Sequence, residues 1–291
     1  MLARAEGAPP ATLVDMLRRR AKQRGGDRVY SFIHDDGRRE SLTFGELDRQ
    51  ARAIAQRLSA HVGPGDRVLL LHPPGLDYAI AFYGCLYAGC VAVPAFPPND
   101  GRMRRGAERL SVIVADAGAR LALSTRAVLV TGVIARALPG LPVLPSDQLA
   151  RADPMAWHEP MIGSFSLALL QYTSGSTSSP RGVMLTHRNM LHNAGIQRRA
   201  WQLSSASVGV SWLPLFHDLG VITCLIQPIF TGFATRSPAT CTLPLKGNCR
   251  PVASFIRVDL PQPDGPTTAA NSPRFTRIER PSTASVPSAP P

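Results

Sequence analysis

The sequence predicts an α/β protein with mostly parallel sheets flanked by helices, followed by an unstructured C-terminal tail. Short apolar strand segments alternate with helical patterns, and this alternation is typical of parallel sheets covered on both faces. Residues 237–291 contain eleven prolines and no sustained period of 2 or 3.6 residues. We therefore divide the chain into an α/β domain, residues 1–236, and a Pro/Ser/Thr-rich tail, residues 237–291, that is disordered or translated from a shifted frame.

Capping and turn signals predict the first elements. Thr12, with Asp15 three residues later, begins a helix. The Asp-Gly step at Gly37 lies between two β-prone segments and predicts a hairpin, because this step favours a turn with positive φ. Thr43 and Glu46 form a capping-box pattern at the start of a second helix.

From residue 67 the pattern repeats short strand and helix. The segments with strand character are 67–71, 90–95, 121–124, 141–144 and 165–172. Helices are expected between them, including 78–87 and one within 104–117. Ligands of open parallel sheets bind at the carboxyl ends of the strands, so the segment after Tyr172 is a candidate site.

Composition argues against several classes of protein. The net charge of +12 comes almost wholly from scattered arginines, with no long basic run, so we expect no nucleic-acid binding. The five cysteines form no C-x-x-C pair and the N-terminus lacks a signal-type apolar run, which predicts a reduced, cytoplasmic protein. The uncharged stretch Tyr78–Phe96 is interrupted by glycines and a proline, so we interpret it as core and not as a membrane span.

The segment TSGSTSSPRG, residues 173–182, predicts an anion-binding loop. Glycines let successive backbone N–H groups turn inward, and hydroxyls and an arginine add donors for a polyphosphate. It is not a Walker A loop, because Val183-Met184 stands where that motif requires Lys-Ser/Thr. The alternative is a flexible Ser/Gly linker, against which the preceding strand and the following helix cap at Thr186 argue. The assigned residues are Thr173, Ser174, Gly175, Ser176, Thr177, Ser178, Pro180, Arg181 and Gly182.

This loop, with the Thr-His-x-Asn helix start after it, resembles the phosphate loop of the adenylate-forming enzymes, the acyl-CoA synthetase and luciferase-like superfamily. Residues 82–98, 112–125 and 211–232 resemble one branch, the fatty acyl-AMP ligases. The resemblance identifies residues 1–236 as a partial N-terminal AMP-binding (adenylation) domain. It implies ATP- and Mg²⁺-dependent activation of a long-chain fatty acid to an acyl-adenylate. The acceptor it implies is an acyl carrier protein of a polyketide or lipopeptide synthase, with a long-chain acyl-CoA synthetase as the alternative.

The resemblance also implies roles for single residues. Residues 173–182 would hold the β- and γ-phosphates of ATP, with Arg181 in place of the lysine that is more frequent in the family. His217 would border the acyl and adenylate pockets, or else fix a turn with Asp218. The acyl-tunnel candidates, which serve a core equally well, are Trp212, Phe216 and Ile222. No metal ligand is assigned.

Two residue pairs are interpreted as structural. His187 and Asn189 lie at a helix start, and Trp157 and His158 lie in a loop.

Relatives carry later segments that this sequence lacks. They include an aromatic-Gly-x-Thr-Glu segment that stacks adenine and an essential lysine in a small C-terminal domain, whereas no G-x-T-E occurs in 237–291 and Lys246 lacks the family context. We therefore expect little or no turnover from this chain alone, and an exposed apolar face near residues 220–232. A non-catalytic nucleotide or acyl-carrier binding module and a mis-framed product without function stay open as alternatives.

Overall fold

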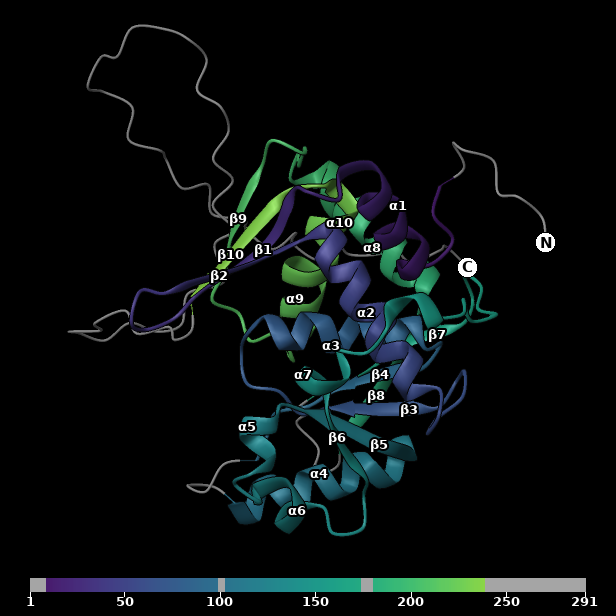
Figure 1. The fold of residues 1–291 in the computed structure, drawn as a ribbon, viewed down its shortest axis with the longest axis vertical. Helices are drawn as coiled ribbons and strands as arrows, with labels where there is room; N and C mark the ends of the chain where they lie inside the picture. The colour runs from purple at the N-terminus through teal and green to yellow at the C-terminus, as the bar shows by residue number, and fades with distance from the viewer. Residues whose placement is uncertain (1–8, 99–102, 174–179, 239–291) are drawn as a thin grey trace, which may run out of the picture. The chain divides into compact units, whose positions relative to one another are not determined.

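Two sheets with helices between them organise the residues that the computed structural model describes, which are 9–98, 103–173 and 180–238 (Figure 1). Helices α2 and α3 lie between the sheets, and α4, α5 and α6 lie on the far side of the larger one. This arrangement confirms the predicted α/β class with mostly parallel sheets flanked by helices.

The larger sheet has the strand order β6-β5-β3-β4-β7-β8. Its strands are β3 (Arg67–Leu70), β4 (Val91–Pro94), β5 (Ala119–Ser124), β6 (Val143–Pro145), β7 (Leu167–Thr173) and β8 (Arg181–Thr186). All neighbours are parallel except β7 and β8, which form an antiparallel pair at the edge. The five parallel strands were predicted from the apolar segments, whereas β8 was not.

The smaller sheet has the order β2-β1-β10-β9. Its strands are β1 (Arg28–Ile33), β2 (Arg39–Thr43), β9 (Val208–Val210) and β10 (Ala234–Pro238). The predicted hairpin joins β1 and β2, and Gly37 has a φ of 82° in its turn. Strand β10 pairs with β1 in parallel and ends at Pro238, two residues beyond Arg236. The domain boundary that the sequence predicts at residue 236 stays a prediction.

The helices begin where the capping patterns predicted. The Thr12 hydroxyl accepts a hydrogen bond from the Asp15 N–H (3.0 Å), and Thr43 and Glu46 form a complete capping box. The helices are α1 (Leu13–Arg24), α2 (Phe44–Leu58), α3 (Leu76–Tyr87), α4 (Met103–Ala117), α5 (Arg126–Leu129), α6 (Val133–Ala137), α7 (Ser146–Leu149), α8 (His187–Ala200), α9 (Asp218–Gly220) and α10 (Gln227–Thr231). A 3₁₀ turn, η2 (Pro154–Ala156), follows α7, and one stretch of π-helix, η3 (Val221–Ile226), joins α9 to α10.

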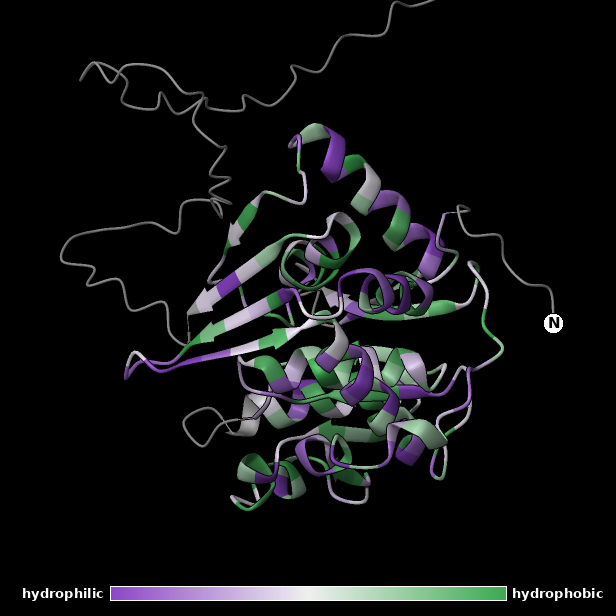
Figure 2. Ribbon diagram, turned by 45° about the horizontal axis from the view of Figure 1, so that its top comes forward, coloured by the Kyte–Doolittle hydropathy of each residue, from purple (hydrophilic) through white to green (hydrophobic). Residues whose placement is uncertain are grey.

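The core explains the long uncharged stretch. Figure 2 shows apolar residues concentrated on the strands of the larger sheet and on the helices beside them. In α3 the side chains of Tyr78, Phe82, Tyr83 and Tyr87 are fully buried, and burying a side chain of this size stabilises a fold by about 1.5–3 kcal/mol. The stretch therefore forms a twelve-residue helix and a core strand. Within the described part of the chain, no helix combines the length and apolar character needed to cross a membrane.

The expectation of an exposed apolar face near residues 220–232 is wrong. Val221, Leu225 and Ile226 are buried, because α1 and α8 pack against η3 and α10. Apolar side chains are exposed elsewhere, among them Met184 (63% exposed) and Val183 on the edge strand β8.

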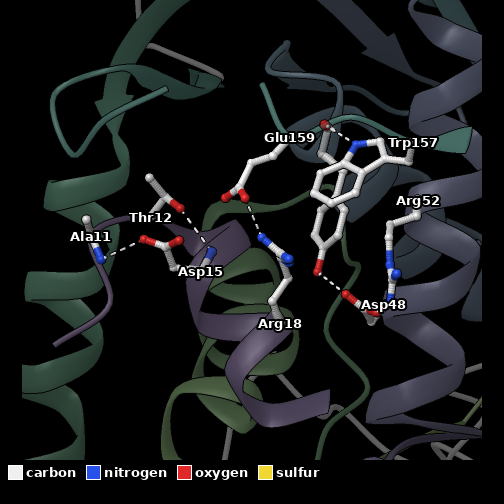
Figure 3. Close-up of polar contacts among 9 residues, drawn as sticks. Ala11, Thr12, Asp15, Arg18, Asp48, Arg52, Trp157 and Glu159 are labelled. Atoms are coloured by element: carbon white, nitrogen blue, oxygen red, sulfur yellow. Dashed lines mark hydrogen bonds and ion pairs between the residues drawn. The ribbon is translucent and has the colours of Figure 1, made fainter. Parts of the chain in front are cut away.

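A polar network joins three helices to the segment after η2 (Figure 3). The buried Asp48 carboxylate on α2 accepts a hydrogen bond from the Tyr87 hydroxyl (2.8 Å) and pairs with Arg52. The Trp157 indole donates to the Tyr87 carbonyl (2.9 Å), and the Arg18 guanidinium lies 5.2 Å from the Trp157 ring centroid. Trp157 is therefore structural, as predicted.

Candidate functional site

The predicted phosphate loop follows β7 in the sequence and precedes β8, and these two strands pair in an antiparallel ladder. Thr173 and Arg181, which flank the loop segment, are paired at the end of that ladder. Thr173 is the last residue of β7, so this pair lies where the parallel strands end, which is the usual ligand edge of such folds. The predicted contacts Ser174, Gly175, Ser176, Thr177 and Ser178 lie outside the described residues.

The base of the loop is anchored on both faces of β7. Gln171 is 6% exposed, and its Nε2 donates to the Phe216 carbonyl (3.2 Å). On the other face the Tyr172 hydroxyl donates to Asp116 Oδ2 on α4 (2.5 Å). Burial, reinforced by this carboxylate, raises the pKa of Tyr172, so the phenol stays protonated and keeps donating. The loop therefore starts from a strand whose side chains fix its position.

The predicted residues at the end of the loop are placed by β8. The Arg181 side chain is exposed, and Pro180 precedes it outside the ladder. Gly182 is paired with Tyr172, and a Cβ at position 182 would lie 3.0 Å from the Tyr172 ring. Close packing against this ring is a reason for glycine that the sequence did not reveal.

The helix after β8 starts with the predicted cap. The Thr186 hydroxyl accepts from the Asn189 N–H (3.2 Å), and Asn189 Oδ1 accepts from the Thr186 N–H (3.0 Å). His187 Nδ1 accepts a hydrogen bond from the Leu13 N–H (3.2 Å). Burial lowers the pKa of His187 to about 4, so the ring stays neutral and able to accept. Both residues are structural, as predicted.

His217 lies in the turn before α9. Its Nδ1 is 2.5 Å from Asp218 Oδ1, and both side chains are exposed. The pairing fixes the turn, and the exposure leaves the ring open to a ligand. Gly220 packs on the same turn, because a Cβ there would lie only 2.1 Å from the Pro214 carbonyl oxygen.

The three acyl-tunnel candidates have different surroundings in the structure. The Phe216 ring makes an edge contact with Phe96, with 5.1 Å between centroids, and Phe96 is 54% exposed just beyond the carboxyl end of β4. Ile222 packs against the core from η3, and Trp212 is partly exposed. Sequence reasoning did not single out Phe96 as a neighbour of the candidate Phe216, although its position immediately after a predicted core strand was a signal.

Two further features near these residues were not predicted from the sequence. Gln171 was not singled out, because its partner Phe216 is 45 residues away. The π-helical stretch η3 follows His217 closely, and such stretches occur frequently at functional sites. In the part of the chain that the structure describes, no three His, Cys, Asp or Glu side chains gather as a metal-binding group.

Comparison with known proteins identifies relatives of this site and fold. The family model described as AMP-binding enzyme matches residues 17–246. The chain is 39% identical over 249 residues to the medium-chain-fatty-acid–[acyl-carrier-protein] ligase JamA of Moorena producens, covering 83% of this chain and 41% of that protein. It is 36% identical to the long-chain-fatty-acid–AMP ligase FadD32 of Mycolicibacterium smegmatis, covering 77% and 37%. The chain thus spans about two-fifths of the length of these curated relatives.

Solved structures agree with the sequence comparison. The fatty acyl-adenylate ligase of L. pneumophila, in complex with acyl adenylate and pyrophosphate, superposes with a TM-score of 0.72 and 35% identity, covering 78% of this chain and 39% of that one. The adenylation domain of a keto acid-selecting NRPS module has 21% identity and a TM-score of 0.70, and supports the fold alone.

Proposed function

Because the chain belongs to the AMP-binding family of adenylate-forming enzymes, we propose that it supplies the phosphate and acyl sites of a fatty acyl-AMP ligase. The observation that carries the proposal is the Thr173–Arg181 pair at the end of the β7–β8 ladder, next to Gln171 and Tyr172, whose side chains are anchored on the two faces of β7. In this reaction a carboxylate oxygen attacks the α-phosphorus of ATP and pyrophosphate leaves. Its barrier is mostly charge and alignment, which a fixed set of donors lowers.

The proposed division of labour follows the position of each residue. The loop, with Arg181 as its cation, would hold the β- and γ-phosphates of the departing pyrophosphate. His217 would border the adenylate, and the Phe96–Phe216 pair offers an apolar wall for the acyl chain. Mg²⁺ would enter with the triphosphate, since nucleotide sites hold this ion through one or two carboxylates and the substrate phosphates.

We propose a long-chain fatty acid as the substrate and an acyl carrier protein of a polyketide or lipopeptide synthase as the acceptor. The activity of the relative JamA, a medium-chain-fatty-acid–[acyl-carrier-protein] ligase, supports a carrier-protein acceptor, and that of FadD32, a long-chain-fatty-acid–AMP ligase, supports a long acyl chain. The alternatives are transfer to coenzyme A and a binding module without chemistry. A cytoplasmic location is also proposed, since Cys85, Cys90 and Cys224 are buried free thiols of the kind that a reducing compartment maintains.

Binding experiments on the purified chain test the phosphate site. We expect Arg181→Ala to weaken ATP binding about tenfold or more, because a charge-assisted hydrogen bond contributes about 1.5–3 kcal/mol. The same variant should bind an acyl-sulfamoyl adenosine, which lacks the β- and γ-phosphates, as tightly as wild type. Arg126→Ala, an exposed arginine on α5, is the matched control. Unchanged ATP affinity in Arg181→Ala would remove the phosphate-loop assignment.

Pyrophosphate release with ATP, Mg²⁺ and a saturated fatty acid tests turnover. We expect ATP binding with little or no release, because the adenine-stacking segment and the essential lysine implied by the family resemblance are lacking in the sequence. Robust release that disappears in Gly175→Ala or Arg181→Ala would show that the chain is a complete catalyst.

A further inference from the structure

One face of α8 carries two arginines and a histidine along with an exposed aliphatic side chain. Arg188, His192, Ile196 and Arg199 are exposed and recur at intervals of four, four and three residues, so they share one stripe of the helix. Ile196 is 44% exposed in the middle of this stripe. The opposite side of α8 is buried against the core, so this stripe faces outward.

The stripe is extended by an aromatic ring from the segment before β7. Phe165 is 71% exposed, and the Arg188 guanidinium lies 5.1 Å from its ring centroid. We call Phe165, Arg188, His192, Ile196 and Arg199 the basic face. It combines arginine and aromatic side chains, which are the types enriched at protein interfaces, and it contains no lysine.

Few acids lie near the basic face; one is Asp15 on α1, whose charge acts on His187, next to Arg188. Between residues 160 and 238 the sequence contains one acid, Asp218, and that carboxylate pairs with His217. Toward α1, the Glu159 carboxylate pairs with Arg18 (2.5 Å). The cations of α1 add to the positive potential, since burial together with Arg24 and Arg198 lowers the pKa of Arg20. The net charge of the chain, +12, has the same sign.

We propose that the basic face docks an acidic helical protein, the acyl carrier protein that accepts the acyl group. This inference rests on the proposed function. An apolar residue with Arg199 one turn away and Arg188 two turns away on the same stripe matches a helix that presents carboxylates beside an apolar side chain, and arginine forks bind carboxylates in a bidentate manner. Complementary charge of this kind speeds association and sets the orientation of the partner.

A lipid surface is the less favoured occupant. A helix that lies in a membrane interface turns its main apolar side toward the acyl chains. In α8 that side, with Met190 and Ala194, is buried in the core. The ring of Phe165 also lies against a guanidinium, which leaves less of it free to insert.

The test measures the affinity of the full chain for a purified bacterial holo-acyl carrier protein of fatty-acid synthesis. We expect Arg188→Glu/Arg199→Glu to weaken binding by about tenfold or more, because charge complementarity across an interface is reversed. The control is Arg109→Glu/Arg126→Glu on α4 and α5, which makes the same change in net charge in the layer beyond the larger sheet. It should change the affinity for the carrier protein by less than about threefold, because salt screens charges at that distance. Ile196→Ser should weaken binding without any change in charge.

Three results would overturn the proposal. They are no binding by the wild-type chain, equal weakening in both double variants, and binding to vesicles of phosphatidylcholine and phosphatidylglycerol without binding to the carrier. ATP affinity of the same variants is measured in parallel. Carrier binding lost with ATP binding retained supports the docking face, whereas carrier binding without any ATP binding in wild type would refute the proposed function and leave the docking face standing.

Discussion

Replacing Gly220 with alanine tests how the turn that carries His217 is held in place. A Cβ at residue 220 would lie 2.1 Å from the Pro214 carbonyl oxygen and 2.9 Å from its carbon. The neighbouring atoms belong to the backbone, so no side chain can rotate away. The turn from Pro214 to His217 must move by roughly 1 Å to restore contact distance, and overpacking of this kind costs about 1–3 kcal/mol.

Gly195 provides a matched control on α8. Both glycines are helical, but a Cβ at residue 195 would meet its nearest neighbours at 3.7 Å, an ordinary contact. Gly195→Ala should therefore raise the free energy of unfolding by about 0.5–1 kcal/mol, through helix propensity and the lower entropy of the unfolded chain. The two substitutions add the same methyl group and have opposite expected signs.

Urea unfolding followed by circular dichroism measures both effects. We expect the midpoint of Gly220→Ala to fall by about 1 M and that of Gly195→Ala to rise slightly. Affinity for an acyl-sulfamoyl adenosine should fall in Gly220→Ala and stay unchanged in Gly195→Ala, because only the former displaces Phe216 and His217. A Gly220→Ala chain as stable as wild type, with unaltered affinity, would refute this account of the turn.

Four further predictions follow from single contacts. Asp48→Ala should lower the free energy of unfolding by about 3 kcal/mol in urea titrations, because it leaves the buried Tyr87 hydroxyl and Arg52 without their acceptor. Tyr87→Phe should lower it by only about 1 kcal/mol, and equal losses in the two variants would contradict this role of Asp48. Burial holds the pKa of His187 near 4, so the unfolded chain takes up a proton first as the pH falls below about 6.5, and His187 should remove about 2 kcal/mol of stability between pH 7 and pH 5. His187→Gln should reduce this pH dependence, with the remainder due in part to His72, whose pKa burial lowers to about 3; an unchanged pH profile would disprove the assignment. Gln171→Met removes the donor to the Phe216 carbonyl and should weaken acyl-adenylate analogue binding about fivefold, while Tyr172→Phe on the other face of β7 leaves that contact intact. Met184→Lys on the edge strand β8 should reduce self-association in sedimentation velocity runs, because a charge on an exposed edge strand opposes pairing with another chain. No difference from wild type would show that this strand does not mediate self-association.

The predictions that the structure confirms depended on residues close together in the sequence. The helix starts at Thr12, Thr43 and Thr186 depend on residues three positions apart, and the hairpin at Gly37 depends on one Asp-Gly step. The inner parallel strands β3 and β4 are short apolar segments buried on both faces, and their composition predicts strands without knowledge of their neighbours. Features of this range are encoded within a few residues of each other.

The features that were missed or wrongly predicted depended on partners outside their own segment, and two of these partners lie far along the chain. Residues 181–186 form a strand because β7 offers its edge, although Val183 and Met184 do not alternate with polar residues. The burial of residues 221–229 requires α1, which lies about two hundred positions earlier in the sequence. The contact of Gln171 with Phe216 likewise joins segments that no local pattern connects.

The pairing of β1 with β10 has a consequence for the order of folding. Tyr30 lies opposite Thr235, so the first hairpin acquires its inner neighbour only after more than two hundred residues have left the ribosome. Until then one edge of β1 lacks a strand beside it and invites mispairing. Expression plasmids shortened before residue 238 should therefore yield insoluble product, whereas those extending past it retain the closing strand.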